Sequence, residues 1–225
     1  MNEAQSPDNA PFKPEYIKLH HYSYRRTEEG INTLYRTIDG KETIVPVDIY
    51  CGIDPASSLT ARSDFFVIAV IAIDSESNKY IVDIVREKID PAYQPESIIN
   101  IYKKYKPKRI RIETTGYQEA LRSNVRKMML EQKLYIPGLE KGIKPRNRKS
   151  ERLMSLVPML ARGEFFFRNV DIIPQQEFLS YPRGKHDDVL DAIYYAVHNV
   201  QPARLKSLDG VIVKKQNKVL DWMTL

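Results

Sequence analysis

Apolar residues first appear in three strand-length runs, at 47–53, 65–73 and 80–87, each bounded by turn-forming residues. The run at 65–73 is wholly apolar, which is typical of a strand buried on both faces. Because only short links join the three runs, we expect them to form an antiparallel meander.

Helical and extended patterns then alternate along the chain. Apolar positions at helical spacing predict helices over 95–105, 118–133, 150–162, 174–180 and 187–199. Shorter apolar runs predict strands over 109–113, 134–136 and 164–167. This order predicts an α/β fold: a mixed sheet that begins as a three-strand meander, continues as parallel β/α units and is flanked by helices.

Both ends of the chain differ from this central pattern. Residues 1–15 hold three prolines and few apolar residues, and 34–45 is typical of a hairpin around Asp39-Gly40. We therefore divide the chain into an N-terminal arm and hairpin (1–46), one domain (47–202) and a basic C-terminal tail (203–225).

Positive charge is concentrated in two segments. The chain has 35 Lys and Arg against 29 Asp and Glu, a net charge of +6. Segment 103–111 carries six excess positive charges and segment 141–152 carries five, so the remaining residues are acidic overall. Dense local basic segments indicate a polyanionic partner such as nucleic acid.

Cysteine content and hydropathy indicate the cellular compartment in which the protein is expected. The single cysteine, Cys51, excludes a disulfide framework within the chain and favours a reducing environment. No apolar run reaches the ~20 residues of a membrane span, and the N-terminus lacks a signal pattern. We expect a soluble intracellular protein without a membrane partner.

Acidic residues lie at the ends of predicted elements. Asp54 closes the first strand, Glu113 closes the fourth, and Asp187 and Asp188 open the last helix. Asp191 follows Asp188 by three residues, on nearly the same helix face. If the first and fourth strands are neighbours, these carboxylates meet at one edge of the sheet.

Such a carboxylate cluster needs a neutralising cation. Oxygen ligands suit Mg²⁺ or Mn²⁺, and two such ions assist phosphodiester hydrolysis. Each residue also has an ordinary structural interpretation. Asp54 before Pro55 suits a turn, and Asp187 and Asp188 suit a helix cap. Glu113 is close enough in sequence to form an ion pair with Arg109 or Arg111.

Several motifs together resemble a known family. They are GIDPA (52–56), SD (63–64), IETTGYQ (112–118), KPRNRKSERL (144–153), RGEFFF (162–167) and HDDVLDA (186–192). In this order they resemble the ribonuclease-H-like nuclease superfamily, and more narrowly the nuclease domain of the large terminase subunit of tailed double-stranded DNA viruses. The resemblance extends over roughly residues 47–200.

The resemblance implies a two-metal-ion endodeoxyribonuclease that cuts concatemeric viral DNA during packaging. Its catalytic residues fall on Asp54, Glu113 and Asp188, with Asp187 and Asp191 as further metal ligands, and the motifs leave open which of the last three binds metal directly. The implied partners are double-stranded DNA, a packaging ATPase domain, the small terminase subunit and the portal, in the cytoplasm of an infected host cell. The phosphate-binding loop G-x-x-x-x-G-K-[ST] is absent from this sequence.

The basic segment 141–152 is the expected DNA contact. Its phosphate-binding side chains are Lys144, Arg146, Arg148, Lys149 and Arg152. A solvated helix face is the alternative, and in 103–111 the lysines also suit a helix end. Two other functions stay open: a Holliday-junction-resolvase-like nuclease of the same fold, and a non-catalytic nucleic-acid-binding module.

Overall fold

The structure is a computed structural model that describes residues 10–38, 40–56, 65–113, 117–139 and 147–204. Its strands are β1 (Lys18–Leu19), β2 (Tyr22–Arg26), β3 (Asn32–Ile38), β4 (Lys41–Pro46), β5 (Asp48–Asp54), β6 (Phe66–Ile73), β7 (Lys79–Glu87), β8 (Arg109–Ile112) and β9 (Phe165–Phe167). Its α-helices are α1 (Gln94–Tyr105), α2 (Tyr117–Glu131), α3 (Lys149–Met154), α4 (Val157–Ala161), α5 (Ile172–Ser180) and α6 (Asp188–Val197). None of these helices is long and apolar enough to cross a membrane.

The main sheet is mixed, as the sequence predicts. Its six strands run in the order β1-β9-β7-β6-β5-β8. Strands β5, β6 and β7 form the expected antiparallel meander, and β8 pairs in parallel with β5. The prediction that the first and fourth strands of the domain are neighbours is therefore confirmed.

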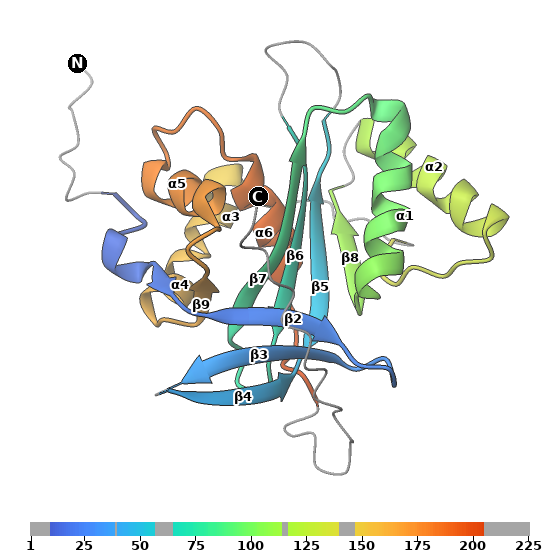
Figure 1. Ribbon diagram of the computed structural model, residues 1–225. Helices are drawn as coiled ribbons and strands as arrows, with labels where there is room; N and C mark the ends of the chain where they lie inside the picture. Colours follow the sequence, from blue (N-terminus) through green and yellow to red (C-terminus); the bar gives the residue numbers. More distant parts are fainter. Residues whose placement is uncertain (1–9, 39, 57–64, 114–116, 140–146, 205–225) are drawn as a thin grey trace, which may run out of the picture.

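Helices cover both faces of this sheet (Figure 1). Every residue of β6 is buried, which explains its wholly apolar sequence. On one face, Ile49, Cys51 and Ile53 pack into a core with α1 and α2. On the other face, residues of β6 pack with α3 to α6. Burial on two sides makes this a three-layer α/β domain.

Helix α6 crosses β5 at unusually short range. A Cβ atom added to Gly52 would lie 2.0 Å from the carbonyl oxygen of Ala192 and 2.4 Å from the amide nitrogen of Ala196. Only glycine permits this approach of helix backbone to strand backbone. Because Asp54 follows two residues later, the close crossing brings the acids of α6 toward the end of β5.

A second, three-stranded antiparallel sheet lies across one end of the main sheet (Figure 1). The expected hairpin is present as β3 and β4, although residue 39 of its turn lies outside the described residues. The Tyr22 hydroxyl of β2 donates to the carbonyl oxygens of Ile81 and Phe166, each at 3.0 Å. These bonds join the N-terminal segment to the domain.

Four local predictions differ from the structure. The strand expected at 134–136 is absent from the described residues, where Pro137 instead accepts a hydrogen bond from the amide of Ile110 at the edge of β8. The helix expected at 150–162 is split into α3 and α4, because Pro158 cannot continue an α-helix and stands in the first turn of α4. Strands β1 and β2 were not expected, nor was the burial of Phe12, which is 1% exposed and packs against Phe178. The boundary placed at residue 46 remains a prediction.

Candidate active site

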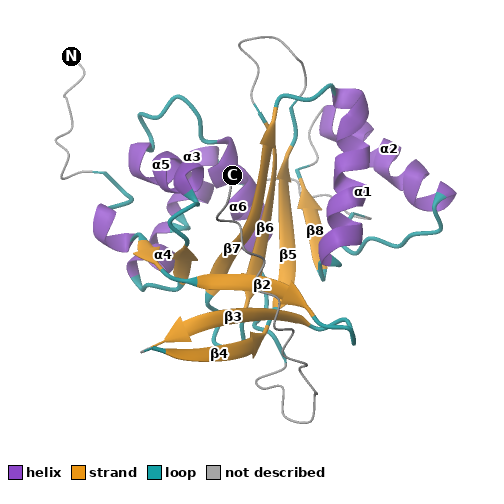
Figure 2. Cartoon of the chain, in the orientation of Figure 1, coloured by secondary structure: helices purple, strands orange, loops and turns teal. Residues whose placement is uncertain are grey.

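Asp54 and Glu113 lie side by side at the ends of neighbouring strands. The parallel register of β5 and β8 pairs Ile53 with Ile112, and the two acids are the next residue on each strand. This end of β5, toward the upper part of Figure 2, is where the open α/β sheet gathers its loops. The first two carboxylates of the candidate site are thus positioned by backbone pairing alone.

Helix α6 brings two more acids to the same end. Its amphipathic sequence is buried along its whole length, and Asp188 and Asp191 are each only 3% exposed. The backbone amide of Phe65 donates to Asp188 Oδ2 at 3.4 Å, and His186 Nδ1 lies 3.7 Å from the same oxygen. Asp187, the N-cap residue, makes no side-chain cap hydrogen bond.

The ionisation of Asp54 is strongly disfavoured by its surroundings. Burial raises the pKa of Asp54 well above its ordinary value, and the carboxylates of Asp191, Asp188 and Glu113 raise it further. Lys149 opposes this shift. A carboxyl whose ionisation is disfavoured by burial and by like charges is typical of a functional site.

Two cations of α3 reach into this group of acids. Lys149 Nζ lies 2.6 Å from Asp187 Oδ1 and 2.7 Å from Asp191 Oδ2. Arg152, which is 8% exposed, places Nη2 at 3.1 Å from Asp191 Oδ1 and 3.7 Å from Glu113 Oε2. Side chains of the protein thus supply positive charge among the carboxylates.

The titration of these groups reflects the same contacts. Burial raises the pKa of Asp191, although Lys149 and Arg152 oppose the rise. Burial alone would lower the pKa of Lys149, but Asp191 and Asp187 outweigh it and raise that pKa. Among the described residues, no three His, Cys, Asp or Glu side chains are arranged to hold a metal ion.

Glu113 has a partner that the sequence reasoning missed. The Tyr195 hydroxyl of α6 donates a hydrogen bond to Glu113 Oε2. Tyr195 follows Asp188 by seven residues and Asp191 by four, so helical periodicity alone indicates that it shares their face. Arg109 and Arg111 direct hydrogen bonds to the carbonyls of Asn199 and His198, just after α6.

The predicted DNA-contact residues fall into three groups. Lys144 and Arg146 lie outside the described residues, and Arg148 is exposed immediately before α3. Lys149 and Arg152 lie against the acids, as described above. Their role in DNA binding remains a prediction, and their ion pairs show that they also neutralise the site.

The other basic segment, 103–111, makes intramolecular contacts. Lys104 Nζ lies 3.2 Å from Asp83 Oδ2, and Lys108 Nζ lies 2.7 Å from Asp48 Oδ2. With Arg109 and Arg111 near the carbonyl end of α6, this segment complements a helix dipole and local acids. Its charge is therefore used largely within the fold.

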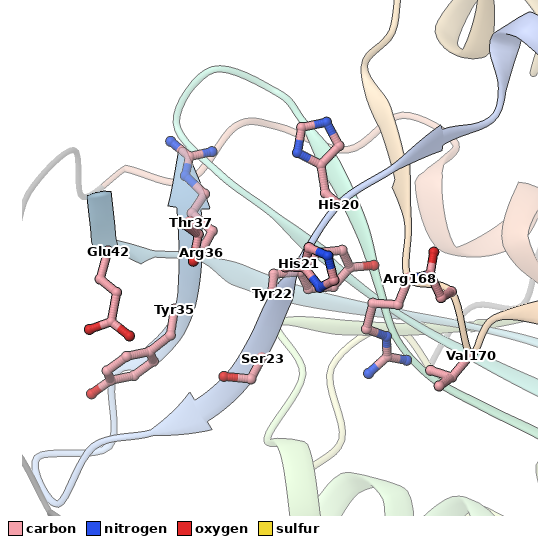
Figure 3. A pocket seen from close by; sticks show the side chains of 11 residues that line it. His20, His21, Tyr22, Ser23, Tyr35, Arg36, Thr37, Glu42, Arg168 and Val170 are labelled. Atoms are coloured by element: carbon pink, nitrogen blue, oxygen red, sulfur yellow. The ribbon is translucent and has the colours of Figure 1, made fainter. Parts of the chain in front are cut away.

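A cavity of about 490 Å³ lies away from the acids, beside the second sheet (Figure 3). His20 and His21 line it together with Arg36 and Arg168. Arg36 is already paired with Asp74 at 3.3 Å, and Arg168 with Asp171 at 2.7 Å. The candidate active site, formed by the acids, lies at the opposite end of the main sheet from this cavity.

Solved structures similar to this chain include nuclease domains of viral terminases. They include the large terminase nuclease from thermophilic phage G20c with bound zinc (16% identity, 86% of this chain and 100% of that chain, TM-score 0.56). The Thermus phage P74-26 large terminase nuclease domain (14%, 87% and 100%, 0.53) and the P22 large terminase nuclease domain (14%, 82% and 89%, 0.53) are also similar. At these identities the likeness establishes the ribonuclease-H-like fold.

The chain spans 40% of the length of a large terminase from another thermophilic bacteriophage, with 12% identity over 68% of this chain and a TM-score of 0.48. No curated protein matches the sequence. Residues 51–200, more than half of the chain, match the family described as the terminase RNase H-like domain. Matched both by its sequence and by its fold, this chain belongs to the terminase RNase H-like domain family.

Proposed function

We propose that this chain is a metal-dependent endonuclease that cuts double-stranded DNA. The observation that carries the proposal is Asp54, a partly buried carboxyl of raised pKa at the end of β5, with Asp188, Asp191 and Glu113 around it. This arrangement stands on the fold of the terminase RNase H-like domain family. Clustered acids at a strand end suit phosphodiester hydrolysis better than packing.

The chemistry of the donor set suits a hard divalent cation, although the described side chains are not arranged around one ion position. It consists of carboxylate oxygens, which suit Mg²⁺ or Mn²⁺, and the raised pKa of Asp54 marks a place where positive charge is favourable. We assign Asp54, Glu113 and Asp188 as the residues that would hold metal, with Asp187 and Asp191 as further ligands. When bound, two such ions supply Lewis-acid activation of water and stabilisation of the leaving oxygen.

The remaining side chains of the site orient the acids or neutralise their negative charge. Tyr195 fixes one oxygen of Glu113 through its hydroxyl, and the Phe65 amide holds Asp188. Lys149 and Arg152 lower the repulsion that the acids would otherwise exert on a phosphate. Basic residues before α3, including Lys144, Arg146 and Arg148, would bind the DNA backbone without reading its sequence.

Plasmid nicking with Mg²⁺ or Mn²⁺ tests the proposal. We expect metal-dependent cutting by the wild type, and a loss of at least ~10²-fold in Asp54→Asn, Glu113→Gln and Asp188→Asn, because each removes a charged oxygen ligand. Asp48→Asn is the matched control, since Asp48 begins the same strand and pairs with Lys108. A wild type without metal-dependent cutting, or an Asp54→Asn variant that cuts normally, contradicts the proposal.

Binding to DNA across salt concentrations tests the basic segment. Replacing Lys144, Arg146 and Arg148 by Ala should weaken duplex binding and reduce its salt dependence, because fewer counterions are released. Affinity that is unchanged at every salt concentration would remove this assignment.

The substrate within the nuclease class is a separate question. Asp188 and Asp191, three residues apart on α6, also suit a junction resolvase of the same fold. We favour linear duplex DNA, and with it action beside a packaging ATPase domain, the small terminase subunit and the portal in the host cytoplasm, because of the family match. Preferential cutting of four-way junctions over linear duplex would reverse this choice.

A further inference from the structure

The first turn of α6 is capped by another helix. Asp187 at the N-cap position makes no side-chain cap hydrogen bond, so its own side chain leaves the first amides of α6 without a cap. Glu177 of α5 supplies an acceptor, because its Oε2 receives the Val189 amide at 2.9 Å and the Leu190 amide also bonds to it. These two amides directly follow Asp188 in the sequence, so the contacts of Glu177 hold the start of α6 at Asp188.

Glu177 is an unusual residue for a cap. It is only 6% exposed, and its burial raises its pKa to about 7. Capping is usually done by a local Ser, Thr, Asp or Asn, without burying a long charged side chain. A buried carboxylate persists when a partner stabilises it, and Arg86 of β7 places Nε 3.5 Å from Glu177 Oε1.

Arg86 connects this pair to the other side of Asp188. Its guanidinium carbon lies 3.5 Å from the centroid of the Phe65 ring, and Phe65 donates its amide to Asp188 Oδ2. The Phe65 ring also meets His186 edge-on at 5.2 Å, and His186 lies beside the same carboxylate. Phe65 and His186 therefore contact Asp188 directly, and Glu177 of α5 and Arg86 of β7 contact its neighbours.

We propose that Glu177 and Arg86 are positioning residues for Asp188, Glu177 through the first turn of α6 and Arg86 through Phe65. The inference rests on the proposed function, because that function makes Asp188 a metal ligand. Groups that orient metal ligands in this way typically change metal affinity by about 10- to 100-fold when removed. A purely structural pair would change stability alone.

Substitution of Glu177 separates these roles. Glu177→Leu removes both the acceptor and the charge, whereas Glu177→Gln keeps an acceptor oxygen for the Val189 amide. In DNA-free protein we expect Glu177→Leu to weaken Mn²⁺ binding about 10-fold, and Glu177→Gln to recover most of it. Hydrogen exchange of the Val189 and Leu190 amides should accelerate in Glu177→Leu and stay near the wild-type rate in Glu177→Gln.

Two further variants keep the test decisive. Asp74→Asn is the matched control, because Asp74 is equally buried and paired with Arg36 at the other end of the sheet; it should lower stability and leave Mn²⁺ affinity unchanged. Arg86→Gln probes the same network while leaving the Glu177 side chain in the sequence. It should weaken Mn²⁺ binding, and it provides the test if Glu177→Leu does not fold.

The outcomes are distinguishable. Folded Glu177→Leu or Arg86→Gln protein that binds Mn²⁺ and cuts as the wild type does overturns the inference alone. Equal loss of Mn²⁺ affinity in Asp74→Asn also overturns it, because a general stability effect then suffices. Wild-type protein that neither binds Mn²⁺ nor cuts DNA overturns the proposed function itself.

Discussion

Buried carboxylates occur at both ends of the main sheet, in opposite surroundings. At the turn end, between β6 and β7, Asp74 accepts hydrogen bonds from the Glu76 and Asn78 amides, both at 2.9 Å, and from the Tyr80 hydroxyl at 3.1 Å. Arg36 adds an ion pair. One acid here is thus surrounded by several hydrogen-bond donors.

At the other end of the sheet, carboxylates outnumber the cations that contact them. We call this the acid end; it is formed by Asp54, Glu113, Asp187, Asp188 and Asp191. Two cations of α3 pair with three of these five carboxylates: Lys149 with Asp187 and Asp191, and Arg152 with Asp191 and Glu113. Burial and mutual repulsion raise the pKa of Asp54 there. Donors in excess characterise a structural carboxylate, whereas carboxylates in excess characterise a place prepared for external positive charge.

The strongest effect should come from disrupting the acid end by moving α6. Gly52→Ala would place Cβ 2.0 Å from the Ala192 carbonyl oxygen. We expect destabilisation above the ~1–3 kcal/mol usual for overpacking, because backbone rather than side chain must shift. Chemical denaturation measures it. Gly40→Ala, whose added Cβ meets nothing within 4 Å and whose φ is +74°, isolates the cost of backbone strain at about 1 kcal/mol.

A smaller effect should distinguish the two ends, because replacing one acid at each end should change the free energy of unfolding in opposite directions. Asp74→Asn should lower the free energy of unfolding by about 1–3 kcal/mol and leave DNA cutting intact. Asp54→Asn should abolish cutting and, in metal-free buffer, raise the free energy of unfolding by about 1 kcal/mol, because it removes a repelled charge. Destabilisation by both variants would show that Asp54 is structural.

A still smaller effect concerns the cations of α3. Lys149→Met should lower the metal-free unfolding free energy by about 0.5–1 kcal/mol, a modest value because Lys149 is half-exposed. Adding Mg²⁺ should restore more stability to Lys149→Met than to the wild type, since the ion replaces the lost charge. Lys104→Met removes an exposed pair with Asp83 and should not respond to Mg²⁺.

The weakest effect concerns the turn end and its response to pH. Hydrogen bonds from Arg162 and Lys79 lower the pKa of Glu164 to about 2, below the ~4.3 of an unfolded chain. The stabilisation is therefore present above pH ~4.3 and disappears as pH falls toward ~2. Glu164→Gln should cost about 0.5 kcal/mol at pH ~7 and nothing near pH ~2 in urea denaturation. A constant difference across this range would contradict an electrostatic origin.

Much of the fold was predictable because its signals are local. The apolar run 65–73 and the helical spacing in 187–199 each depend on neighbouring residues, and both elements form where expected. The short segment 134–136 was assigned wrongly as a strand, since three apolar positions do not determine whether a partner strand is available. Strand β1 escaped notice for the same reason: two residues become a strand only because β9 lies beside them.

The positions of the acids at element ends follow from the sequence alone, as does the family to which the chain belongs. The partners of those acids follow from tertiary packing. Lys149 meets Asp187 across 38 residues, and Tyr195 meets Glu113 across 82. Such contacts depend on how α3 and α6 pack against the sheet, and Gly52 controls that packing for α6. Local periodicity specifies each helix, whereas the distance between two helices is set by the side chains buried between them.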